Sequence, residues 1–230
     1  KEEIPNKMWP LPVSELFMLG KKTVPKLYNM QIKTIGQLAK ADKKILQKKF
    51  GKHGALMWEY ANGIDNSEVK YLPEKPKCIS NSVTLPINIS NLNKLEEIVL
   101  VISDQVSYRL RREGLLANTV NVQLRTKDFE DTSHQGKLAQ ATDVTKEISE
   151  KAKELLRQRY KKGMQIRLVG VKVDNLVEKD KQQLSLFSKE NKKQENLDKA
   201  MDTIKEKYGY NIIKRAGKME VDGIVKLKDV

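Results

Sequence analysis

Hydrogen-bond donors and cations recur along short segments in the middle of the chain, where several alternate with apolar residues. Ser80 and Ser82 lie in one such segment, and Arg125 ends another. Hydroxyl and guanidinium groups are among the groups with which proteins contact phosphate oxygens. We therefore expect a phosphate-binding surface in this region. Its candidate residues are Ser80, Ser82, Arg125, Lys127, Lys137 and Arg167.

A second candidate site is the motif Gln183-Leu184-Ser185-Leu186-Phe187, which has charged residues on both sides. This pattern is typical of a peptide that docks into a partner: Leu186 and Phe187 fill an apolar pocket and Gln183 makes polar contacts. The alternative is an edge strand or a short helix that packs on its own domain. The predicted binding residues are Gln183, Leu184, Leu186 and Phe187.

Catalytic and metal-binding residues are not expected. Phosphoryl transfer requires clustered carboxylates that hold two divalent ions. The acid pairs Glu96-Glu97 and Glu130-Asp131 lie on a helix face and in a turn, where solvation is the simpler explanation. With two histidines and one cysteine in the chain, a zinc site is improbable. We predict no cofactor in this chain.

The charge of the chain indicates a polyanionic partner. The net charge is +14 over 230 residues, with 44 basic and 30 acidic side chains. The basic excess is 6 in residues 1–75, 5 in 76–176 and 3 in 177–230, so it does not come from one basic tail. This distribution favours a protein that follows an extended phosphate backbone. A generally lysine-rich composition without a functional meaning is the alternative.

The single cysteine excludes an internal disulfide and favours a reducing, cytoplasmic location. The longest apolar run, residues 98–102, is too short to cross a bilayer, so we expect no membrane association.

The phosphate-binding candidates require a folded domain that presents them, and residues 78–176 have a suitable pattern. The predicted order is a strand at 78–85, a helix from 95 to about 114, strands at 120–125 and 133–140, a helix from 144 to about 161, and a strand at 164–173. A β-α-β-β-α-β order predicts an antiparallel four-stranded sheet with both helices on one face. We expect the other face to be open and to carry almost no carboxylate. Gly170 suggests a bulge in the last strand.

The flanking parts differ in character. Residues 1–70 predict short helices joined by tight turns, with Trp9 and Trp58 in their core. Residues 71–77 contain two prolines and no apolar period, as in a linker. Residues 177–230 form a charged tail with a helix at 194–208. The fold class is therefore α+β.

Several segments together resemble the C-terminal half of Y-family DNA polymerases, the lesion-bypass enzymes of the DNA polymerase IV and UV-damage-repair types. Residues 9–17, Trp-Pro-Leu-Pro-Val-Ser-Glu-Leu-Phe, are similar to the start of the family's thumb, and residues 34–39, Thr-Ile-Gly-Gln-Leu-Ala, are similar to a later thumb segment. Residues 77–85 and 166–171 are similar to the first and last strands, in chain order, of the little finger domain. The resemblance covers nearly the whole chain.

The resemblance implies that helix-hairpin-helix turns in the thumb grip DNA. The residues it indicates are Gly20, Lys21, Lys22, Thr23, Lys33, Thr34 and Gly36. Two glycines of the family's turns are replaced here by Met18 and Gln31, which hinders close approach of phosphate to the backbone. Lysines beside these turns compensate by charge.

The resemblance also implies the partners, which are primer-template DNA and a β sliding clamp that binds the motif at 183–187. It implies a monomer near the nucleoid, in an error-prone enzyme whose Mg²⁺-binding palm is absent from this sequence. This chain alone is then expected to bind DNA without polymerising.

Two other interpretations remain open on the sequence alone. One is a stand-alone helix-hairpin-helix DNA adaptor, and the other is a β-α-β-β-α-β protein-interaction domain with incidental charge.

Three arginines lie at the end of a predicted helix: Arg109, Arg111 and Arg112. Their charge would suit either the negative end of the helix dipole or contact with DNA.

Overall fold

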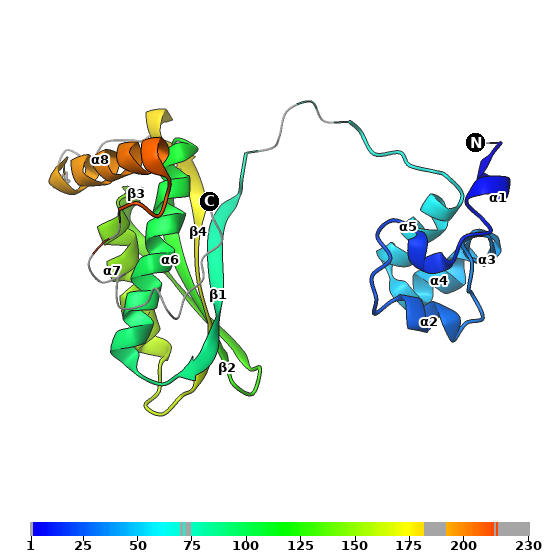
Figure 1. Cartoon of the computed structure of the whole chain (residues 1–230), viewed down its shortest axis with the longest axis horizontal. Helices are drawn as coiled ribbons and strands as arrows, with labels where there is room; N and C mark the ends of the chain where they lie inside the picture. Colours follow the sequence, from blue (N-terminus) through cyan, green and yellow to red (C-terminus); the bar gives the residue numbers. More distant parts are fainter. Residues whose placement is uncertain (1, 70, 72–74, 182–191, 214, 216–230) are drawn as a thin grey trace. The chain divides into compact units, whose positions relative to one another are not determined.

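The computed structural model describes residues 2–69, 71, 75–181, 192–213 and 215, and the chain forms two compact units, Lys1–Pro73 and Glu74–Val230. The first unit is helical and the second contains a sheet (Figure 1). An α+β fold was predicted, and this is confirmed.

The first unit consists of short helices around a small core. Its elements are α1 (Ile4–Lys7), the 3-10 helix η1 (Val13–Glu15), α2 (Val24–Tyr28), α3 (Ile35–Lys40), α4 (Lys43–Phe50) and α5 (Lys52–Ala61). Leu27, Leu38 and Leu46 are fully buried in this core. Both tryptophans pack against the core, and their indole N–H groups donate to the carbonyl oxygens of Ala61 and Ala41, each at 3.0 Å. The sequence predicted this core position.

Two turns of this unit hold non-glycine residues in the left-handed region. Met18 has a φ of 71° and Gln31 a φ of 62°. These are the two positions where the resemblance described above leads to an expectation of glycine. The turns therefore keep a backbone conformation that an L side chain disfavours, by about 1–2 kcal/mol per residue.

The second unit has a four-stranded sheet with the spatial order β1-β4-β2-β3, in which every pair is antiparallel. Its elements are β1 (Cys78–Ile89), α6 (Leu92–Arg112), β2 (Leu115–Thr126), β3 (Asp131–Thr142), α7 (Thr145–Arg159) and β4 (Ile166–Glu178). The β-α-β-β-α-β order agrees with the prediction, although the strands are longer than expected.

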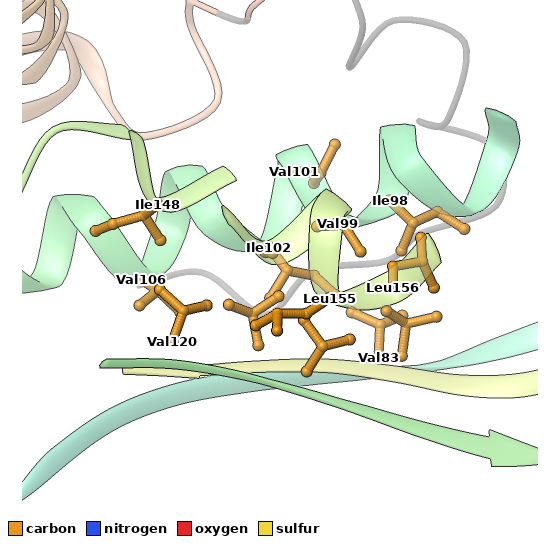
Figure 2. Close-up of a cluster of buried hydrophobic side chains, with 14 of the residues drawn as sticks. Val83, Ile98, Val99, Val101, Ile102, Val106, Val120, Ile148, Leu155 and Leu156 are labelled. Carbon is orange, nitrogen blue, oxygen red and sulfur yellow. The ribbon is translucent and has the colours of Figure 1, made fainter. Parts of the chain in front are cut away.

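Helices α6 and α7 cover one face of the sheet, and the core lies between the two layers (Figure 2). Ile102 and Val106 of α6 and Leu155 of α7 point down onto Val83 and Val120 of the sheet (Figure 2). All five side chains are buried. Because side chains alternate along a strand, burial of this face leaves the intervening residues on the open one.

The bulge of β4 is at Arg167 and not at Gly170. Arg125 of β2 pairs with Leu168, whereas the next residue, Thr126, pairs with Ile166, so Arg167 is the extra residue. The prediction that Gly170 forms a bulge is therefore wrong. Gly170 pairs in regular register with Ser82 and Gln123.

Helix α8 (Lys192–Tyr208) is held on the second unit by ion pairs. Arg111 of α6 donates to Asp202 at 2.5 and 3.0 Å and to Asp198 at 3.3 Å. Asp104 of α6 accepts from Lys205 at 2.8 Å. These groups are largely buried, so removal of one partner leaves an uncompensated charge.

No helix within the described ranges is long and apolar enough to cross a membrane.

Candidate nucleic-acid interface

The open face of the sheet consists of four rows of residues, each row crossing all four strands. Read from β1 to β3, they are Cys78-Asp174-Thr119-Lys137, Ser80-Lys172-Asn121-Gln135, Ser82-Gly170-Gln123-Ser133 and Thr84-Leu168-Arg125-Asp131. Most of these side chains carry a hydroxyl, an amide or a charge. The strand alternation thus brings the predicted Ser80, Ser82, Arg125 and Lys137 onto one surface.

Gly170 makes this surface concave. It lies between Ser82 and Gln123 in the third row, and a Cβ atom there would approach the Cβ of Ser82 to 3.1 Å and that of Gln123 to 3.6 Å. Around this position the face has a hollow of about 490 Å³. Its lining residues are Ser80, Asn81, Ser82, Asn121, Gln123, Asp131, Thr132, Ser133, Gly170, Val171 and Lys172. The hollow is therefore lined mainly by hydrogen-bonding groups.

Two cations of the face are paired with carboxylates. Arg125 donates to Asp131 across the strands at 2.8 and 2.7 Å. The hydrogen bond from this guanidinium lowers the pKa of Asp131 and raises that of Arg125. The amine of Lys172 lies 2.9 Å from the carboxylate of Asp174, and the hydrogen bond between them raises the pKa of Lys172.

The expectation that this face carries almost no carboxylate is thus wrong. The strand register places Asp131 opposite Arg125, whereas Asp174 follows Lys172 by two residues on the same strand, beyond the predicted end of that strand at residue 173. Lys172, Gly170 and Ser133 were not identified as site residues. In the last predicted strand the apolar alternation shifts phase, so the sequence did not show on which face Lys172 and Gly170 lie. In the third predicted strand the alternation was too weak to assign Ser133 to a face.

The remaining sheet candidates lie near one end of the face. Lys127 is exposed in the turn after β2, and its amide N–H donates to the carbonyl oxygen of Gln165 at 2.9 Å. The guanidinium of Arg167 lies 5.0 Å from the ring centroid of Phe129 in the same turn. Phe129 was not singled out from the sequence. The sequence alone does not show that this aromatic residue of a turn lies beside Arg167, because the contact depends on the bulge in β4.

In the first unit, the predicted residues fall into two groups. Gly20, Lys21, Lys22 and Lys33 are exposed, and Thr23 is half-buried. The amide N–H groups of Lys21 and Lys22 make no hydrogen bond to any described residue. These residues present charge and free donors to solvent.

Thr34 and Gly36 instead serve the fold. Thr34 caps α3 in a reciprocal arrangement with Gln37: its hydroxyl accepts from the Gln37 amide, and the Gln37 side chain accepts from the Thr34 amide, each at 3.2 Å. Gly36 is buried, and its N–H donates to the carbonyl oxygen of Trp9 at 3.0 Å. A Cβ atom there would come within 2.8 Å of the Trp9 side chain. Its amide is therefore not free for phosphate.

The arginines at the end of α6 have separate roles. Arg111 is buried in the ion pairs that hold α8, so it is not available to DNA. Arg109 donates to the carbonyl oxygen of Ser80 at 3.1 Å. Glu96, one member of an acid pair considered above, accepts from Arg157 at 2.7 and 2.8 Å and so links α6 to α7. The motif Gln183–Phe187 lies outside the described residues.

Comparison with known proteins gives two family matches that follow each other along the chain. Residues 16–65 match the model described as DNA polymerase-iota, thumb domain. Residues 76–186 match the model described as impB/mucB/samB family C-terminal domain. The two matches fall on the helical unit and on the sheet unit, respectively.

Relatives named DNA polymerase IV match almost the whole chain. The protein of Clostridium acetobutylicum is 42% identical over 221 residues, which is 96% of this chain and 56% of the relative. That of Acetivibrio thermocellus is 36% identical, over 94% of this chain and 55% of the relative. The chain therefore spans about half the length of the curated relatives it matches.

A solved Y-family DNA polymerase chimera has a similar fold, with a TM-score of 0.59 at 19% identity. The similarity covers 77% of this chain and 51% of that structure. From the two family matches and the relatives, we conclude that the chain belongs to the Y family of DNA polymerases, with a helical thumb followed by a little finger domain.

Proposed function

We propose that this chain is the DNA-gripping part of an error-prone translesion polymerase that acts in DNA damage tolerance. The observation that carries the proposal is the open sheet face: hydroxyl and amide groups line a hollow together with the amine of Lys172 and the carboxylate of Asp131, on a chain with a net charge of +14. Hydroxyl, amide and amine groups contact the phosphates and sugars of primer-template DNA. The exposed lysines of the thumb add a second contact region.

The face is suited to phosphates rather than to bases. None of the residues in its four rows is aromatic, so it offers no platform on which a base would stack. Binding is therefore electrostatic and insensitive to sequence. A weak, sequence-independent grip also tolerates damaged template, because it makes no demand on base geometry.

Catalysis is assigned to another part of the enzyme. No group of three or more acidic, histidine or cysteine side chains suited to a metal ion occurs among the residues described. We infer that the Mg²⁺ ions and their carboxylates belong to a palm domain that this sequence does not include. We also infer that the chain acts as a monomer near the nucleoid.

We also propose that residues 183–187 tether the enzyme to a β sliding clamp. The support is the sequence pattern and its position between two described parts of the second unit: it follows η2 (Lys179–Lys181) and precedes α8. Leu186 and Phe187 are the apolar anchors, and Gln183 supplies polar contacts.

The DNA-binding proposal is tested by placing a negative charge on the sheet face. Ser82→Glu directs a carboxylate toward the hollow, and Asn196→Glu adds the same charge at an exposed position of α8. Binding to a fluorescein-labelled primer-template duplex is followed by anisotropy. We expect Ser82→Glu to weaken binding about tenfold and Asn196→Glu to weaken it less than twofold. Equal effects of the two variants would contradict the proposed face.

A further inference from the structure

Phe129 and Arg167 form a contact at the end of the open sheet face that the proposed phosphate binding does not yet explain. The guanidinium carbon of Arg167 lies 5.0 Å from the ring centroid of Phe129, within the range of a cation–π interaction. Phe129 is 65% exposed, so the ring contributes little to the core. Its φ of 64° lies in the left-handed region, which a phenylalanine disfavours.

The local backbone holds these two residues together, one in a turn and the other in a strand. In the turn between β2 and β3, the Phe129 N–H donates to the carbonyl oxygen of Thr126 at 3.1 Å. The neighbouring Lys127 N–H donates to Gln165, just before β4, at 2.9 Å. Arg167 is the extra residue of the β4 bulge. The turn and the bulge are thus tied to each other, and the ring is held beside the guanidinium.

Arg167 differs from its neighbour Arg125 in the charge that surrounds it. Arg125 forms a bidentate ion pair with Asp131, which offsets its charge. Within the described part of the chain, Arg167 makes no ion pair, and its partner is the neutral ring. A ring orders a planar guanidinium without neutralising it, and the N–H groups at the guanidinium edge stay available to a phosphate.

We propose that Phe129 is a positioning residue that holds Arg167 in the orientation needed to bind a DNA phosphate at this edge of the sheet. This inference rests on the proposed DNA-binding function. An exposed phenylalanine in a left-handed turn position is not explained by the fold, because asparagine or glycine would suit the turn better. Its use is to order the unpaired arginine.

The test is a double-mutant cycle in the full chain, read by anisotropy with a labelled primer-template duplex over a series of NaCl concentrations. The variants are Phe129→Ala, Phe129→Tyr, Arg167→Ala and the double variant Phe129→Ala with Arg167→Ala. The matched control is Tyr208→Ala on α8, where an aromatic side chain that is 61% exposed lies 5.2 Å from the amine of Lys207.

We expect Arg167→Ala to weaken binding about fivefold and to reduce the slope of log K against log salt by about 0.9, as for one lost phosphate contact. Phe129→Ala should weaken binding about threefold and shift the slope in the same direction, although it removes no charge. Phe129→Tyr keeps the ring and should bind like the unmodified chain. In the Arg167→Ala background, Phe129→Ala should change the dissociation constant by less than about 1.5-fold.

Additive effects of the two substitutions would overturn the inference, because Phe129 would then act independently of Arg167. A loss in Tyr208→Ala equal to that in Phe129→Ala would also overturn it. If Arg167→Ala has no effect while Ser82→Glu still weakens binding, the positioning role fails and the proposed function stands. If the unmodified chain does not bind the duplex, the proposed function itself fails.

Discussion

Two residues of the thumb, Met18 and Gln31, lie in backbone conformations that an L side chain disfavours. Met18 and Gln31 occupy left-handed positions in two thumb turns where the polymerase family usually has glycine. An L side chain in this conformation costs about 1–2 kcal/mol per residue, so each of the two positions lowers the stability of the thumb.

Gln31→Gly should stabilise the thumb. The substitution relieves left-handed strain of about 1–2 kcal/mol and loses part of that gain to the greater freedom of the unfolded chain, which leaves about 0.5–1 kcal/mol. The two tryptophans of the sequence, Trp9 and Trp58, both lie in the thumb, so thermal unfolding followed by their fluorescence reports this unit. Gly51→Ala is the control of opposite sign: Gly51 has a φ of 65° and open space around it, so alanine should destabilise. A lower unfolding temperature for Gln31→Gly would contradict the argument.

Asp131 should limit DNA binding, because it competes with phosphate for Arg125. Asp131→Asn removes the competing charge, and we expect the duplex to bind about threefold more tightly, with a steeper salt dependence. Anisotropy measures both quantities. The control is Asp131→Asn combined with Arg125→Ala, which should cancel the gain. Weaker binding by Asp131→Asn alone would mean that the carboxylate orients Arg125 for phosphate instead.

The elements of the second unit differ in how well they could be predicted. The helices and strands of the little finger domain follow from apolar periodicity, because a two-layer core requires one apolar face on each element. The pairing of Arg125 with Asp131 and the bulge at Arg167 did not follow, since both depend on strand register. The docking of α8 was also not predictable. Its contacts with α6 include the ion pairs of Arg111 and Asp104, and ion pairs between distant segments leave no periodic pattern in a sequence.

Helix α8 should depend on the buried carboxylate of Asp104. This group accepts from Lys205 at 2.8 Å and from Tyr210 at 2.9 Å, and Lys205 is 2% exposed. Asp104→Asn leaves the lysine unpaired, and we expect a loss of about 3 kcal/mol in the local stability of α8. Hydrogen–deuterium exchange of α8 amides measures this loss. Asp174→Asn breaks a more exposed pair in the sheet and should leave α8 exchange unchanged; equal exchange in both variants would refute the dependence.

The same carboxylate sets the pH dependence of α8 docking. Burial by itself raises the pKa of Asp104, but the charge and hydrogen bond of Lys205 and the hydrogen bond of Tyr210 outweigh it and hold the pKa below 3.8. Because the folded-state pKa is lower than the unfolded one, the stabilisation is fully present above pH 3.8 and is lost as the pH falls through the lowered value. Hydrogen–deuterium exchange of the α8 amides should thus show that this stabilisation is retained between pH 7 and pH 5. Detachment within that range would contradict this assignment.

At the scale of the whole molecule, we propose two binding functions on one chain: DNA binding by the sheet face and the thumb, and binding of a sliding clamp by residues 183–187. Leu186→Ala combined with Phe187→Ala should abolish clamp binding in calorimetry, because burial of both side chains supplies roughly 3–6 kcal/mol before ordering costs. DNA binding by the same variant should be unchanged. Clamp affinity that survives the double substitution would exclude this motif as the tether.

We propose that DNA lies on the open face of the sheet. The most direct test is a titration of the ¹⁵N-labelled chain with an unlabelled primer-template duplex, followed by amide chemical shifts in NMR spectra. We predict that the largest shifts in the little finger domain occur in the row that contains Ser82, Gly170, Gln123 and Ser133. The amides of α7, on the opposite face, should change little. Shifts concentrated on α6 and α7, with the open face unperturbed, would contradict the account.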